Sequence, residues 1–178
     1  MNIQFDNFIL SAFESSQAPL LFNLIDSNRS RLEAFFSGTV SQTKNLEDTI
    51  NYSKLIDKRK AEKSYFPFII SDKVSGAFIG LVDVKNIDWS VPKAEIGYFI
   101  DKNYEGQGII SKALAAVVDY IVEKYSFKKL LCRANSQNLG SIHVALKNGF
   151  EFEGTIRNDY KTSDNTLMDL NYYGRIFE

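Results

Sequence analysis

The sequence predicts an α/β fold in which helices cover a mixed β-sheet. Three patterns indicate it: apolar residues at helical spacing in the first third of the chain, short aromatic and branched segments from position 65, and a later strand, helix and strand in succession. A chain of 178 residues, 44% of them hydrophobic, is long enough to bury its own core. No repeat, low-complexity tract or Pro/Gly/Ser-rich linker marks a boundary, so we expect one domain over residues 1–178.

Composition and charge exclude several classes of partner. The 21 basic and 22 acidic residues give a net charge of -1, so no overall field draws the chain to nucleic acid or to an anionic membrane, and we expect neither partner. One cysteine and one histidine argue against a disulfide framework and a zinc site, and we expect no metal. No signal peptide and no membrane-length apolar run is present, which indicates a cytoplasmic protein.

Residues 1–64 are expected to be helical. Apolar residues between Leu20 and Ile25 recur at the spacing of one helix face, and Asn45 is a typical N-cap for a second helix. The charged run "DKRKAEK" is expected to be the solvated end of that helix.

Three short strands are expected next, in the segments "YFPFII" (65–70), "AFIGLVDV" (77–84) and "AEIGYFI" (94–100). Turn residues separate them, which is typical of an antiparallel meander. Because proline has no N–H to donate, Pro67 places the first segment at a sheet edge or at the start of a strand.

The second half of the chain alternates helices and strands. Apolar residues from Ile110 to Ile121 form one helix face, and "KKLLCRA" (128–134) is expected to be a buried strand. We therefore expect a parallel crossover from 94–100 to 128–134. A helix over 138–147 and two closing strands, 150–156 and 166–176, complete the order.

The turn "NYEGQG" directly precedes the crossover helix and is expected to bind an anion. Gly106 and Gly108 let the backbone approach a ligand with no Cβ in the way, and the first N–H groups of a helix have no partner within it. The positive end of the helix dipole favours a phosphate or diphosphate there. The turn lacks the Gly-Lys-Ser/Thr ending of a nucleotide triphosphate loop and the third glycine of a dinucleotide loop.

Longer segments carry a family resemblance. The strings "KAEIGYFIDKNYEGQGIISKALAAVVDYI", "CRANSQNLGSIHVALKNGFEFEGTIRNDY" and "DLNYYGRI" resemble the GNAT N-acetyltransferases, and within them the ribosomal-protein-serine acetyltransferase (RimL-like) branch. The resemblance implies a GNAT fold, with a central sheet that splays open between 94–100 and 128–134. It also implies that acetyl-CoA lies in the gap on the 65–178 part, while the helical 1–64 part shapes the acceptor pocket.

The resemblance implies a set of acetyl-CoA-binding residues. The family's diphosphate loop falls on residues 105–110, with Gly108 at its central glycine, and the family pairs the pantetheine arm with the strand before the loop. The implied residues are Phe99, Ile100, Gly106, Gln107, Gly108, Ile109, Ile110, Ser111, Asn138 and Ser141. Glu105 departs from the family's basic or amide residue, and we expect it to face solvent because a carboxylate beside a diphosphate costs affinity.

Acetyl transfer to an amine needs a base. A protonated amine must lose a proton before it attacks, and Glu95 matches the strand glutamate that the family often uses as a base through water. Asp159, in "RNDY", matches an acidic residue near the acceptor and is the second candidate. A solvated strand position for Glu95 and a turn aspartate for Asp159 are the structural alternatives.

The leaving thiolate also needs a partner. The family's usual tyrosine acid falls on Ala145, so the resemblance assigns Ser141, with Asn138, to the sulfur, and backbone N–H groups near Phe99 to the thioester carbonyl. The structural alternative is that Asn138 caps the helix that contains Ser141.

Several other residues are left open. His143 is assigned no role, Cys132 is expected to be a buried apolar residue, and an acyl-cysteine route is the least favoured mechanism. Phe36, Tyr52 and Trp89 are expected either to line an acceptor pocket or to lie in the core.

The expected function is direct acetyl transfer from acetyl-CoA to a primary amine, in the first place a protein N-terminal amine such as that of a ribosomal protein. A small amine such as a polyamine or drug is the alternative acceptor. A catalytically silent CoA-binding module and an unrelated nucleotide-binding protein are the alternatives. The RimL-like branch often forms homodimers, so a homodimer is possible here as well.

Overall fold

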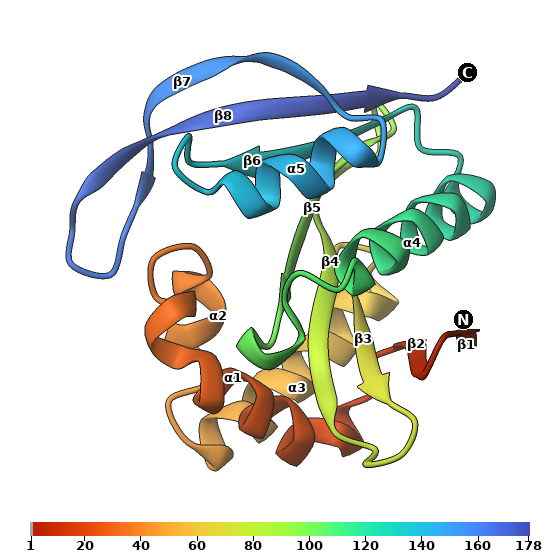
Figure 1. Ribbon diagram of the computed structural model, residues 1–178, viewed down its shortest axis with the longest axis vertical. Helices are drawn as coiled ribbons and strands as arrows, with labels where there is room; N and C mark the ends of the chain where they lie inside the picture. The colour runs from red at the N-terminus through yellow and green to blue at the C-terminus, as the bar shows by residue number, and fades with distance from the viewer. Residues whose placement is uncertain (1) are drawn as a thin grey trace.

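The computed structural model describes residues 2–178, and its centre is an open eight-stranded sheet (Figure 1). The strands lie in the order β1-β2-β3-β4-β5-β6-β8-β7. Their bounds are β1 Asn2–Phe5, β2 Phe8–Ala12, β3 Phe66–Asp72, β4 Phe78–Asp88, β5 Lys93–Ile100, β6 Lys129–Ala134, β7 Glu151–Lys161 and β8 Leu167–Ile176. The α-helices are α1 Ala18–Leu32, α2 Ser37–Ser41, α3 Leu46–Ala61, α4 Ile109–Tyr125 and α5 Leu139–Lys147, and two short 3-10 turns are η1 Ser15–Gln17 and η2 Lys102–Tyr104.

The helical expectation for residues 1–64 is wrong at the N-terminus. Residues 2–12 form the hairpin β1–β2, and β2 pairs antiparallel with β3 from Phe8↔Asp72 to Ala12↔Phe68. Phe8 and Leu10 point into the core, and this burial stabilises strands that are too short to show a clear alternating pattern. The helices α1, α2 and α3 occupy the rest of that part, and Asn45 caps α3 by accepting a hydrogen bond from the Asp48 N–H at 2.9 Å.

The three-stranded meander is confirmed as β3, β4 and β5. Pro67 is the second residue of β3, so the strand-start expectation holds, whereas β3 itself lies inside the sheet between β2 and β4. The Pro67 carbonyl accepts a hydrogen bond from the Phe13 N–H at 3.0 Å.

Helices pack on both faces of the sheet and divide the core in two. One cluster joins α4 and α5 to the strands through residues such as Leu114, Val118 and Ala145. The other joins α1 and α3 to the opposite face through Ile25, Ile56 and their neighbours. Side chains alternate along β5, so Ile96 lies in the first cluster and Phe99 in the second.

The sheet splays open between β5 and β6, as the resemblance implied. These two strands are parallel and joined by α4, but they pair only at Lys93↔Lys129, Ala94↔Leu130 and Glu95↔Leu131. Beyond Glu95, β5 continues to Ile100 while β6 follows β8 instead. The carboxyl ends of β5 and β6 therefore diverge, and main-chain groups of β5 face the gap. No helix within residues 2–178 is long and apolar enough to span a membrane.

Candidate active site

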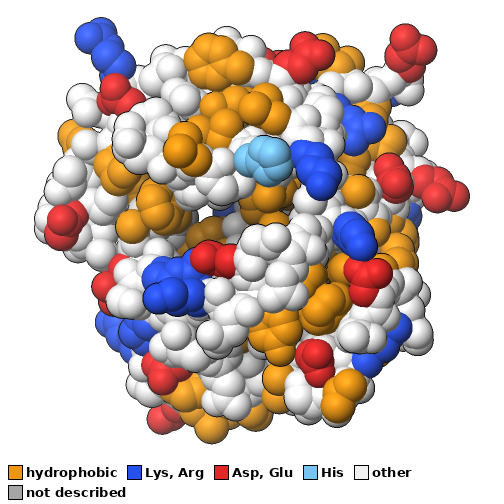
Figure 2. Space-filling model, viewed as in Figure 1, with side chains coloured by type: hydrophobic (Ala, Val, Ile, Leu, Met, Phe, Trp, Pro, Cys, Tyr) orange, Lys and Arg blue, Asp and Glu red, His pale blue; other side chains and the backbone are white. Residues whose placement is uncertain are grey.

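A cavity of about 1100 Å³ occupies the gap between the diverging strands. Its wall is built from the C-terminal part of α1, the free half of β5, the glycine-rich turn, the end of β6, the start of α5 and Tyr160 of β7. Figure 2 shows the hollow from outside, with side chains of both charges around it. Segments far apart in the sequence meet here because the crossover through α4 returns the chain beside β5.

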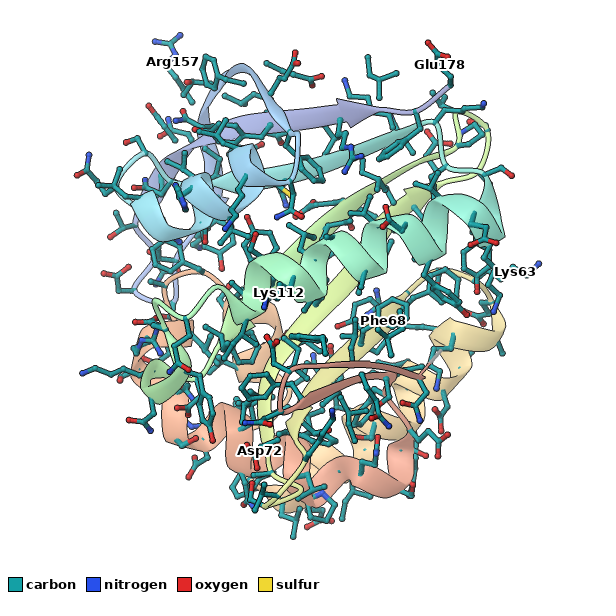
Figure 3. All side chains as sticks on the ribbon, turned by 45° about the vertical axis from the view of Figure 1, so that its right-hand side comes forward. Lys63, Phe68, Asp72, Lys112, Arg157 and Glu178 are labelled. Carbon is teal, nitrogen blue, oxygen red and sulfur yellow. The ribbon has the colours of Figure 1, made fainter. Side chains whose placement is uncertain are left out.

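The glycine-rich turn has the geometry of an anion cradle. Gly106 and Gly108 both have φ near +73°, and a Cβ placed on either would have no neighbour within 4 Å, so the turn faces open space. Gly108 is the N-cap of α4, and the first N–H groups of that helix are therefore available to a ligand. Lys112, labelled in Figure 3 at the start of α4, points away from the turn to an ion pair with Asp6 at 2.6 Å.

Residues of the turn differ in how they reach the cavity. Gly106, Gly108, Ile109, Ile110 and Ser111 form part of its wall, as do Phe99 and Ile100 of β5. Gln107 is exposed outside the wall and donates to the Asn103 carbonyl at 3.3 Å. The buried Ser111 hydroxyl accepts a hydrogen bond from Asn148 Nδ2 at 3.1 Å, which leaves its own proton available.

Glu105 is exposed, as expected, but it is not free. Its carboxylate forms an ion pair with Arg31 of α1, and both residues belong to the cavity wall. Asn28, one helical turn before Arg31, joins α1 to the same turn by donating to Asp101 Oδ2 at 2.7 Å and accepting from the Lys102 N–H at 3.2 Å. Arg31 thus brings a positive charge beside the cradle from a distant part of the sequence.

The two candidate bases share one guanidinium. Arg133 Nη2 lies 3.0 Å from Glu95 Oε2, and Arg133 Nη1 lies 2.9 Å from Asp159 Oδ2. Glu95 and Arg133 line the cavity, whereas Asp159 lies behind Arg133 and accepts a further hydrogen bond from the Tyr172 hydroxyl at 2.7 Å. Burial alone lowers the pKa of Arg133, but Glu95 and the Tyr172 hydroxyl outweigh it, so the net pKa is raised and the guanidinium stays charged.

Lys85 adds a second cation beside Glu95. Its ammonium lies 3.4 Å from Asp83 and 3.9 Å from Glu95, and 5.2 Å from the ring centre of Phe36. Burial lowers the pKa of Lys85, yet the carboxylates of Asp83 and Glu95 raise it more, and the net shift is upward. Lys85 is therefore cationic at neutral pH and pairs with Oε1 of Glu95, while Arg133 pairs with Oε2.

The other end of the gap holds Asn138 and Ser141. The Asn138 side chain caps α5 by accepting from the Ser141 N–H at 3.2 Å, so the capping alternative is confirmed, and both residues also lie in the cavity wall. The Ser141 carbonyl accepts a hydrogen bond from the Tyr98 hydroxyl at 2.7 Å. Cys132 faces the same place from β6, and burial raises the pKa of its thiol, which keeps it protonated.

The three aromatic residues expected in a pocket or in the core lie in three different environments. Phe36 lines the cavity and packs edge-on against Phe99 with ring centres 5.2 Å apart. Tyr52 is a core residue, whereas both expectations for Trp89 are wrong: it is exposed, lies outside the cavity wall and stacks on Phe127 with ring centres 5.1 Å apart. His143, which was assigned no role, lies in the cavity wall.

The sequence alone did not predict the cavity residues that stand outside any local motif. Arg31, Lys85, Tyr98, Arg133 and Tyr160 all line the cavity, and each comes from a different element of the chain. None belongs to a local pattern with the cradle, since only the folded sheet brings them together. The alternation along β5 was the one available signal, because it separates Tyr98 from the face that carries Glu95.

The splayed sheet, the glycine cradle and the long cavity together define a transferase fold that takes an extended anionic cosubstrate between two strands. The family model "Acetyltransferase (GNAT) domain" matches residues 7–151. The chain therefore belongs to the GNAT acetyltransferase family and is an acetyl-CoA-dependent N-acetyltransferase.

Individual relatives agree with this assignment. The chain is 27% identical over 171 residues to the ribosomal-protein-serine acetyltransferase of Escherichia coli (strain K12), covering 95% of this chain and 92% of that protein. It is 27% identical over 114 residues to the spermidine N(1)-acetyltransferase of the same strain, covering 64% of this chain and 60% of that protein.

Solved structures show the same fold. The ribosomal-protein-S5-alanine acetyltransferase from Vibrio fischeri superposes with a TM-score of 0.90 at 20% identity, over 99% of this chain and 96% of that one. A RimL ribosomal L7/L12 alpha-N-protein acetyltransferase in complex with coenzyme A, joined to one of its cysteines by a disulfide, superposes with a TM-score of 0.89 at 22% identity, over 99% of this chain and 98% of that one.

Proposed function

We propose that this N-acetyltransferase modifies the α-amine of a protein N-terminus. The observation that carries the proposal is the charge of the cavity wall, where Arg31, Lys85, Arg133 and Lys147 stand against only Glu95 and Glu105. Both carboxylates are already paired, Glu95 with Lys85 and Arg133, and Glu105 with Arg31. A polyamine, with several positive charges, needs unpaired carboxylates and meets excess cations instead.

A peptide has a carbonyl oxygen that can accept a hydrogen bond from the cavity wall. Arg133 lines the cavity, and its guanidinium carries five N–H donors. The carbonyl group beside an N-terminal amine is an acceptor for such a donor, whereas spermidine has no acceptor oxygen. An α-amine also has a reference pKa of about 7.7 to 8.0, so a larger share of it is neutral at physiological pH than of a lysine amine.

The residues have the following proposed roles. Glu95, or less favourably Asp159, takes the proton of the amine through water, and backbone N–H groups at Phe99 polarise the thioester carbonyl. The turn holds the diphosphate with Gly106, Gly108, Ile109, Ile110 and Ser111, while Gln107 contributes its backbone. Bound acetyl-CoA supplies the activated acetyl group, and Asn138 and Ser141 lie beside the sulfur.

The position proposed for the sulfur has separate support. Cys132 is the chain's one cysteine, and it lies in the cavity wall between the diverging strands. In the related RimL complex, coenzyme A is joined to a cysteine by a disulfide, which requires the coenzyme's sulfur to contact that side chain. We infer that Cys132 takes the corresponding place in this chain, and we place the thioester next to it.

The helical 1–64 part and the 65–178 part both contribute to this site. Residues between 30 and 36 and residues from β4 to β8 line one cavity, which supports a single functional domain over residues 1–178. A reducing cytoplasm, where protein N-termini emerge, is the compartment that suits the proposed activity and the free thiol of Cys132.

A panel of acceptors tests the proposal. The protein is incubated with acetyl-CoA and with ribosomal-protein N-terminal peptides, the same peptides blocked at the α-amine, and spermidine, and both thiol release and the mass of the products are measured. Acetylation of the free peptides only is the expected result. Faster acetylation of spermidine overturns the N-terminal assignment, and tight acetyl-CoA binding without any turnover indicates the silent module.

A further inference from the structure

We propose that the Tyr98 hydroxyl donates a hydrogen bond to the sulfur of coenzyme A as it leaves. The inference rests on the proposed placement of the thioester between β5 and β6. It assigns a catalytic residue at the sulfur, in addition to Ser141 and Asn138.

The position of Tyr98 follows from the splay of the sheet. Glu95 is the last β5 residue that pairs with β6, and Tyr98 lies three positions further along, where β5 borders the gap. Its side chain lies on the α5 face of the sheet and forms part of the cavity wall. The hydroxyl reaches α5, donates to the Ser141 carbonyl at 2.7 Å and neighbours Cys132, next to which the thioester is proposed to lie.

The hydroxyl is free to change its acceptor. The Ser141 carbonyl lies in the first turn of α5, where the N–H of residue 145 is its helical partner, so it does not depend on Tyr98. A hydrogen bond to an anion is about twice as strong as one to a neutral carbonyl. When charge develops on the sulfur, rotation of the hydroxyl toward it is therefore favourable.

The environment keeps the Tyr98 proton in place. Burial, and then the neighbouring Cys132 thiol, raise the pKa of Tyr98 far above its usual value, so the phenol stays neutral across the physiological range. A neutral phenol is a donor, which is what a thiolate requires. No charged side chain is needed at this end of the gap.

Two other tyrosines in the cavity wall are in the wrong places. Tyr104 precedes the glycine cradle, at the diphosphate end of the cavity. Tyr160 lies across the cavity on β7, where its hydroxyl is 2.7 Å from Ser37 Oγ and accepts from the Ser37 N–H at 3.1 Å. Tyr98 is the one that lies beside Cys132 and Ser141.

The chemical step is an ordinary aminolysis of a thioester. The amine nitrogen forms a bond to the acetyl carbon, and the carbon–sulfur bond breaks with its electron pair passing to sulfur. The proton lost by the amine goes to Glu95 through water, and the thiolate, held by the Tyr98 O–H, is protonated from solvent after release. Tyr98 stabilises charge in this step and keeps its proton.

Replacing the leaving sulfur by selenium distinguishes a hydrogen bond from Tyr98 to the leaving atom from a purely structural role of Tyr98 in supporting α5. Turnover of Tyr98→Phe and Ser141→Ala is compared with wild type for acetyl-CoA and for its selenium analogue, acetyl-seleno-CoA, at saturating N-terminal peptide. A selenol is much more acidic than a thiol, so a selenolate leaves with little help. A side chain that only supports α5 affects both donors equally.

We expect Tyr98→Phe to lower kcat with acetyl-CoA by about 10²-fold and with the selenium donor by no more than about 3-fold. The KM for acetyl-CoA should change little. An equal loss with both donors overturns the proposal, and so does selenium rescue of Ser141→Ala in place of Tyr98→Phe.

A second measurement needs no turnover. The thiol of bound coenzyme A is titrated by its thiolate absorbance in a Cys132→Ala background, with and without Tyr98→Phe. A donor hydroxyl lowers the pKa of the bound thiol, so its removal should raise that pKa by about one unit. An unchanged pKa contradicts the role of Tyr98 even if no acceptor is ever acetylated, while failure of the acceptor panel leaves this result standing.

Discussion

Arg133 and Glu95 form an ion pair at the point where β5 and β6 part, with Nη2 and Oε2 3.0 Å apart. The same guanidinium holds Asp159, so both candidate bases are fixed by one side chain. A carboxylate held in this way has a defined orientation toward the cavity. We propose that Glu95 acts on the amine through water from this fixed position.

Replacing Glu95 by Gln tests the base. Gln keeps the shape but cannot take a proton, so turnover with an N-terminal peptide should fall by about 10²- to 10⁴-fold, while the Kd for acetyl-CoA stays within about 3-fold. The matched variant is Asp159→Asn, which alters the other partner of Arg133. If Asp159→Asn loses the activity and Glu95→Gln keeps it, the roles are reversed.

Glu105→Gln should tighten acetyl-CoA binding. The change removes a carboxylate from the cradle and releases Arg31 toward the phosphates, which is worth about 2- to 5-fold in Kd because both side chains are partly exposed. The gain should shrink in 0.5 M salt, since the Debye length falls with ionic strength. Acetyl-pantetheine, which has no diphosphate, is the control donor, and an equal gain with it refutes the electrostatic explanation.

Gly108→Ala should both destabilise the fold and weaken acetyl-CoA binding. Gly108 has φ near +73°, a conformation that costs a residue with a Cβ about 1–2 kcal/mol, and the new methyl group projects into the cradle. Thermal unfolding with and without acetyl-CoA measures both effects. Gly38→Ala in α2 is the matched control: it also has open space around it but no positive φ, so it should be neutral or slightly stabilising.

Asn28→Ala should loosen the link between α1 and the turn. Asn28 is buried, and its side chain donates to Asp101 and accepts from the Lys102 N–H, so its loss leaves polar groups unpaired at a cost of about 1–3 kcal/mol. Chemical denaturation measures the free energy of unfolding. The exposed Asn23, on the same helix, provides the control, and an equal effect of Asn23→Ala contradicts this account.

Alkaline pH should destabilise the protein. Burial and the nearby Asp83 raise the pKa of Tyr65, and burial raises the pKa of Cys132. The unfolded chain then loses these protons first, from about pH 8.5 for the thiol and about pH 10 for the phenol, while the folded chain keeps them. Stability therefore falls as pH rises through that window. The melting temperature of Tyr65→Phe should fall less steeply between pH 9 and 11 than that of wild type, and parallel curves would contradict the assignment to Tyr65.

The cradle and the order of the later elements could be predicted from the sequence because their signals are local. A glycine-rich turn followed by an apolar helix face is recognisable from neighbouring residues without any tertiary contact. Gly108 is indeed the N-cap of α4. The splay between β5 and β6 came from the resemblance, and the three-pair ladder bears it out.

The charged side of the cavity could not be predicted in this way. Lys85, Glu95 and Arg133 lie on three successive strands, and only the register of β4, β5 and β6 brings them together. Arg31 reaches the cradle because Asn28 fixes α1 beside the turn, a long-range contact with no sequence pattern. The hairpin β1–β2 was missed because strands of four and five residues are stabilised by tertiary burial more than by any local signal.

Because β5 and β6 form only a short ladder, we expect the bound cosubstrate to stabilise the fold as well as to supply the acetyl group. We expect a pantetheine chain bound there to supply main-chain partners that a neighbouring strand would otherwise provide, and so to hold β5 and β6 together. By mass action, a ligand that binds only the folded chain stabilises it, and the gain in free energy grows with the logarithm of the ligand concentration. The melting temperature of the protein should therefore rise with the concentration of acetyl-CoA.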